Sequence, residues 1–150
     1  MKNMKLKMFG EKSISAVLFW VFALLLLLVI ISAVNYIPDL IEDENSLIAL
    51  NIAPLISYLA LLIPLVLLFY AFKKKVLFTK QSIKYLHLFA LTNFLATIFN
   101  WFTMVSFLDM EYVEVFSLSF PNILLITFAI FLATIFKQGS QIQQENELTI

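Results

Sequence analysis

Few side chains in this 150-residue sequence could do chemistry. There is no cysteine and a single histidine, His87, which excludes a thiolate nucleophile, a disulfide framework and a multi-histidine metal site. The two glycines, Gly10 and Gly139, cannot form a glycine-rich phosphate loop. The sequence also has no HExxH motif and no plausibly spaced Ser-His-Asp set. We therefore expect a protein that is not an enzyme and that holds no cofactor and no metal ion.

The densest polar group lies in an otherwise apolar stretch. Asn93, Thr97 and Asn100 recur at steps of four and three residues, which places them on one face of a helix. One interpretation is contact between helices, since an amide in lipid needs a partner and gains about 0.6 kcal/mol from it. The other is a small polar pocket for a ligand. We favour the first, because a pocket usually brings together several polar groups or a charge.

The elements that must position these residues are four long apolar stretches, at 14–34, 47–72, 86–108 and 115–136. Each exceeds the roughly 18 residues that a membrane-spanning helix needs. The whole chain is 62% hydrophobic and 13% charged, whereas soluble domains are roughly 45–50% and about 25%. We expect an all-α integral membrane protein, a four-helix bundle of up-down-up-down topology. It forms one domain, and residues 137–150 make a short tail.

The formal net charge of zero hides a polarised distribution of charge. The lysines are Lys2, Lys5, Lys7 and Lys12 before the first stretch, Lys73, Lys74, Lys75, Lys80 and Lys84 between the second and third, and Lys137 after the fourth. With three glutamates they give one side +7, and the seven acidic residues of the other two loops give −7. The positive-inside rule then places both termini and the middle loop in the cytoplasm. The lysines of the middle loop also suit an anionic lipid surface.

The second and fourth stretches resemble each other in outline. Pro54 and Pro121 each lie near the acidic end of a stretch, close to Asn51 and Asn122. Proline is well tolerated in a first helical turn, and we expect both prolines there. Pro64 lies in the middle of its stretch and is expected to kink the helix. The likeness fits a repeat of two helical hairpins, or simply a shared preference of helix ends for proline and asparagine; we favour the second.

The polar tail carries a short motif, and Gly139 within it is expected to end the fourth helix or let it bend. The matching residues are Gly139, Ile142, Gln143, Glu145, Asn146, Leu148, Thr149 and Ile150. In these tail residues, and in the spacing of its four apolar stretches, the chain resembles an uncharacterised family of four-span bacterial membrane proteins. Tails of that family read G-x-x-[IL]-Q-x-E-N-D-L-T-[IV], so Glu147 stands where aspartate is usual. The resemblance implies a fold and a bacterial source, but no reaction.

Members of that family are often encoded beside a small Cro/CI-type helix-turn-helix regulator. The resemblance therefore implies a non-enzymatic interaction or regulatory protein of the bacterial cytoplasmic membrane. Its partners would be the lipid bilayer and that regulator, or a second copy of the chain, with no direct contact to nucleic acid. The partner-contacting residues would be Glu145, Asn146, Glu147, Leu148, Thr149 and Ile150.

Two other functions stay open from the sequence. Bacteriocin-immunity and membrane-stress proteins are commonly small, multi-span and without catalytic groups. A transporter subunit is less favoured, because no Asp, Glu, Lys or Arg lies within any of the four stretches, and ion-coupled transport needs charged groups within the membrane.

Overall fold

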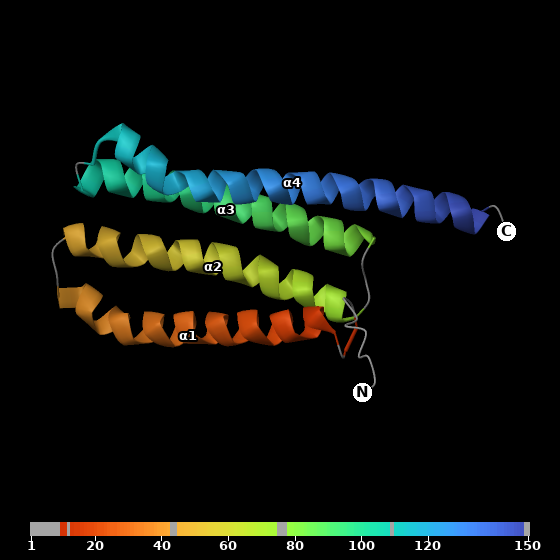
Figure 1. Cartoon of the computed structure of the whole chain (residues 1–150). Helices are drawn as coiled ribbons and strands as arrows, with labels where there is room; N and C mark the ends of the chain where they lie inside the picture. The colour runs from red at the N-terminus through yellow and green to blue at the C-terminus, as the bar shows by residue number, and fades with distance from the viewer. Residues whose placement is uncertain (1–9, 12, 43–44, 75–77, 109, 149–150) are drawn as a thin grey trace, which may run out of the picture.

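The computed structural model describes residues 10–11, 13–42, 45–74, 78–108 and 110–148. Four helices account for nearly all of them: α1 (Ile14–Glu42), α2 (Asn45–Lys73), α3 (Lys80–Leu108) and α4 (Tyr112–Leu148). They run up-down-up-down, and each is long and apolar enough to cross a membrane (Figure 1). The expected all-α, four-span architecture is confirmed, and the chain is a multi-pass membrane protein.

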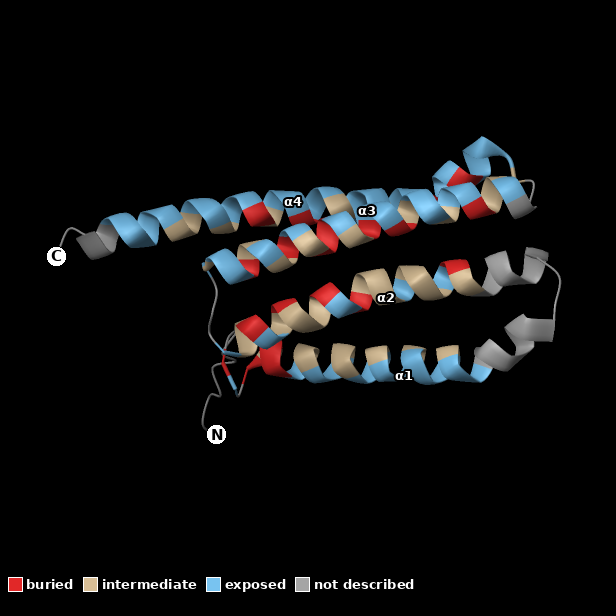
Figure 2. Cartoon of the chain, turned by 180° about the vertical axis from the view of Figure 1, so that it is seen from behind, coloured by how far each residue is buried: buried red, intermediate tan, exposed pale blue. Residues whose placement is uncertain are grey.

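The helices pack in the order in which they occur in the chain. α1 lies against α2, α2 against α3, and α3 against α4; within the described ranges no other pair of helix backbones comes into contact. Side chains of α2, α3 and α4 meet in two buried clusters, one around Leu68, Leu86 and Ala133 and the other around Phe89, Ala90 and Ala129. α1 therefore joins the bundle through a single neighbour, which leaves most of its circumference exposed (Figure 2).

Side chains just before two helices explain where those helices begin. The Ser13 hydroxyl accepts from the backbone N–H of Ala16 at the start of α1, at 3.4 Å. The Thr79 hydroxyl accepts from the N–H of Ser82 at the start of α3, at 3.3 Å. Both are N-caps, which supply an acceptor to N–H groups that have no partner within the helix. Gly10 has a φ of 116°, which favours glycine, and its own N–H donates to the carbonyl of Phe72 at 3.3 Å.

Charge separates the two ends of the molecule. Lys73, Lys80, Lys84 and Lys137 lie at the end where α1 and α3 start and α2 and α4 finish, here called the basic end (Figure 1). The opposite end, here called the acidic end, carries Glu42, Glu111 and Glu114. Lys2, Lys5, Lys7, Lys12 and Lys75 lie outside the described residues. The predicted separation of charge therefore holds for those residues that the structure describes.

Two expectations about helix ends are wrong. Pro54 and Pro121 lie nine residues after the first residues of α2 and α4, well past a first turn. Of the two alternatives for Gly139, that it ends the fourth helix is wrong, since α4 continues to Leu148; that the helix bends there stays a prediction. A glycine ends a helix when it takes a positive φ, and among the described residues only Gly10 does.

Candidate functional site

The polar residues of α3 reach across to α2. Asn93 is buried, and its side-chain amide donates to the carbonyl of Ala60 at 3.3 Å and to that of Phe89 at 2.8 Å. The neighbouring Thr92 shares its hydroxyl proton between the carbonyls of Ala60, at 2.9 Å, and Leu88, also at 2.9 Å. Two donors from α3 therefore converge on one carbonyl of α2.

That carbonyl needs them because of a proline. In an α-helix the carbonyl of Ala60 would accept from the N–H of residue 64, and Pro64 has none. An unpaired carbonyl in a membrane is costly, and side chains of neighbouring helices commonly satisfy it. Thr92 and Asn93 lie opposite the gap and fill it.

The other two residues of the predicted stripe differ from each other. The Asn100 amide donates to the hydroxyl of Ser57 on α2, which in turn donates to the carbonyl of Ala53 at 3.2 Å. The Thr97 hydroxyl bonds only within α3, to the carbonyl of Asn93 at 2.8 Å, and faces α4. The stripe thus joins α3 to α2 through its two asparagines, while Thr97 lines a separate hollow.

Sequence reasoning missed Thr92 and the α2 half of this arrangement. A signal was present: a proline in the middle of a span marks the carbonyl four residues earlier as unpaired. The sequence does not give the relative positions of α2 and α3 along the axis of the bundle. Those positions decide which polar side chain of α3 lies opposite Ala60.

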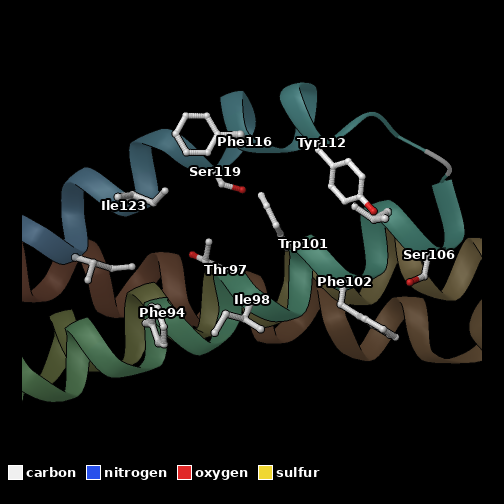
Figure 3. A pocket seen from close by; sticks show the side chains of 12 residues that line it. Phe94, Thr97, Ile98, Trp101, Phe102, Ser106, Tyr112, Phe116, Ser119 and Ile123 are labelled. Carbon is white, nitrogen blue, oxygen red and sulfur yellow. The ribbon is translucent and has the colours of Figure 1, made fainter.

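The hollow beside Thr97 is a pocket of about 540 Å³ between α3 and α4, toward the acidic end (Figure 3). The Trp101 and Tyr112 rings form part of its wall, with centroids 6.3 Å apart. Pro121 removes one backbone hydrogen bond from α4, and the turns before it lean away from α3 (Figure 1). The lining side chains of Phe94, Ile98 and Phe102 are themselves exposed, so the pocket opens sideways onto the apolar surface.

The tail is helical and forms the end of α4. Glu145 is exposed, and Asn146, Glu147 and Leu148 complete the helix. Thr149 and Ile150 lie outside the described residues. At roughly 1.5 Å per residue the 37 residues of α4 span about 55 Å, well beyond the ~30 Å hydrocarbon core, and α4 projects past the other helices (Figure 1).

Gly139 has a packing role in that projection. A Cβ atom there would lie 2.7 Å from Cδ1 of Phe78, in the segment before α3. The Phe78 ring also contacts Phe136, with centroids 5.3 Å apart. The glycine of the tail motif therefore allows a close contact between α4 and the middle loop.

Searches against family models, curated proteins and solved structures find no match to this chain. Within the part of the chain that the structure describes, no three His, Cys, Asp or Glu side chains are grouped to hold a metal ion. Three features of the described residues bear on function: the α2–α3 hydrogen bonds, the pocket between α3 and α4, and the projecting end of α4.

Proposed function

We propose that this chain is a non-enzymatic interaction or regulatory protein of the bacterial cytoplasmic membrane, with both termini in the cytoplasm. It acts by presenting the end of α4 to a small helix-turn-helix regulator. The observation that carries the proposal is the continuation of α4 to Leu148, past its neighbouring helices.

The surface of that projection supports an interaction role. Ile142 lies on it and is 59% exposed, and Gln141, Gln143, Gln144 and Glu145 are exposed around it. In this proposal the Ile142 side chain is the apolar contact that the regulator covers, with the polar residues forming the rim around it. The helix also presents these residues in an already ordered form, which lowers the entropy lost on binding.

Co-purification with the regulator tests the proposal. The full chain, extracted in mild detergent with a co-expressed regulator taken from beside its gene, is expected to retain that regulator. Deletion of residues 141–150 should reduce recovery to background. Ile142→Ala should weaken association about tenfold, because a hot-spot side chain contributes more than about 1 kcal/mol.

Gln138→Ala is the matched control, since Gln138 is also exposed on α4 but lies outside the motif. It should leave recovery of the regulator unchanged. Equal recovery from the full and the shortened chain, or no recovery from either, would contradict the proposal.

A second candidate, protection against membrane-active peptides, is favoured by the pocket between α3 and α4. In the proposed orientation that pocket lies in the outer half of the membrane, where such a peptide arrives. Its aromatic walls and sideways opening suit an apolar peptide side chain.

Growth inhibition tests this second candidate. Cells carrying the gene should withstand a higher concentration of peptide than cells without it, and Thr97→Phe should abolish the difference by filling the pocket. The control is Thr127→Phe: Thr127 is exposed on α4 and its hydroxyl bonds only to the carbonyl of Ile123. Equal sensitivity with and without the gene would dismiss this function.

A further inference from the structure

A second hollow, at the basic end, is built from cationic and polar side chains. It lies between the start of α3 and the end of α4, measures about 630 Å³, and is here called the basic groove. Its walls are Lys80, Ile83, Lys84 and His87 from α3 and Lys137, Ser140, Gln141 and Gln144 from α4. Neither helix alone forms it, so it exists only because the two pack together.

The charges in the groove are unbalanced. Lys80 and Lys84 are one helical turn apart on α3, and Lys137 faces the same hollow from α4. Like charges at this spacing destabilise a helix unless an anion lies between them. Among the residues described, none contributes a carboxylate to the lining. The groove therefore has the charge of a site for an anion.

Polar groups in the walls suit an anion with several oxygen atoms. Ser140 brings a hydroxyl, and Gln141 and Gln144 bring amide N–H donors. His87 also lines the groove, and its Nδ1 atom lies 2.9 Å from the carbonyl of Ile83. Lysine ammonium groups bind phosphate as point charges that tolerate several geometries.

The position of the groove indicates the source of such a phosphate. Lys137 directly follows Phe136, and Lys84 is two residues before Leu86; both apolar residues belong to a cluster of the bundle core. The groove thus begins where the apolar core of the bundle ends, which is the level of the lipid headgroups. Basic pockets between transmembrane helices at this level bind anionic lipid headgroups.

We propose that the basic groove binds the phosphate headgroup of an anionic phospholipid, held between Lys84 on α3 and Lys137 on α4. The lipid would bridge the two helices at the point where α4 leaves the membrane. Gln141 and Gln144 border both this groove and the surface proposed for the regulator, whereas Lys84 and Lys137 lie outside that surface.

Lipid retention by the full chain in neutral detergent tests the proposal. Native mass spectrometry and thermal unfolding would be measured with phosphatidylglycerol, with phosphatidylcholine of the same acyl chains, and with inorganic phosphate. The protein should retain phosphatidylglycerol, which should raise its unfolding temperature, while the other two should do neither. Lys84→Gln with Lys137→Gln should weaken retention about 30-fold, at about 1 kcal/mol for each lysine near the surface.

Lys73→Gln with Lys74→Gln removes the same charge from the same end of the molecule, and neither lysine lines the groove, so retention should be unchanged. If the lysine pair proves necessary for folding, Gln141→Glu gives a second test. It places a carboxylate in the groove at an exposed position and should also release the lipid.

Three results would overturn the proposal. Equal retention of the two lipids would show that charge is not recognised. Equal loss in both lysine pairs would show a general surface effect. Stabilisation by inorganic phosphate as strong as that by phosphatidylglycerol would assign the groove to a soluble phosphate.

Discussion

Replacing Thr92 by valine and Asn93 by leucine together is expected to lower the free energy of unfolding by about 2 kcal/mol. Both donors to the carbonyl of Ala60 disappear, and Pro64 offers no backbone N–H in their place. Each interhelical hydrogen bond contributes about 0.6 kcal/mol. Leaving the carbonyl of Ala60 unpaired in an apolar environment costs a further ~1–3 kcal/mol. The helix relaxes around the unpaired carbonyl, so only part of this cost adds to the loss of the two hydrogen bonds. Unfolding in detergent by titrated SDS would measure the difference.

The reason for this loss can be tested with Pro64→Ala. That substitution returns the N–H that the carbonyl of Ala60 lacks, so the double substitution should then destabilise by less than about 1 kcal/mol. Thr97→Val is the matched control, because its hydroxyl bonds only within α3. An identical loss with and without Pro64 would refute the idea that Thr92 and Asn93 compensate for the proline.

Replacing Gly139 by leucine is expected to destabilise the protein by up to about 2 kcal/mol, because overpacking costs about 1–3 kcal/mol and the better helix propensity of leucine offsets nearly 1 kcal/mol of it. The sign is informative, because at an exposed helical position leucine is favoured over glycine by nearly 1 kcal/mol. Here the new side chain meets the Phe78 ring, which lies against Phe136. Thermal unfolding of the purified protein would show the change.

Phe78→Ala supplies the complementary variant. With that ring removed, leucine at 139 has room, and the double variant should be more stable than Gly139→Leu alone. If Gly139→Leu were stabilising with Phe78 in place, the glycine would have no packing role. Its presence in the tail motif would then need another explanation.

The sequence predicts the membrane-spanning parts of the helices better than the ends of the helices. The apolar stretches at 14–34 and 47–72 match spans of α1 and α2 closely, since a run of uncharged apolar residues is itself the signal for a span. The fourth stretch was predicted to end at residue 136, yet α4 continues to Leu148. Hydropathy predicts which part of a helix lies in the membrane. It does not predict whether the helix continues beyond the membrane into water.

The candidate site was predictable only in part. The spacing of Asn93, Thr97 and Asn100 placed them on one face, but not against a particular helix. The structure shows the two asparagines bonded to α2 and Thr97 facing α4. The basic groove was not predicted, because Lys80 and Lys84 lie more than fifty residues from Lys137 in the sequence and meet it only through packing.

Four membrane-spanning helices, with the described lysines at one end of the bundle, were predictable from the sequence alone. Both follow from local properties, the length of apolar runs and the charge that flanks them. The tertiary structure alone decided that Thr92 and Asn93 lie opposite the carbonyl that Pro64 leaves unpaired, and that Lys84 and Lys137 face one groove. Those pairings depend on the depth and rotation of one helix against another, which short-range side-chain packing sets.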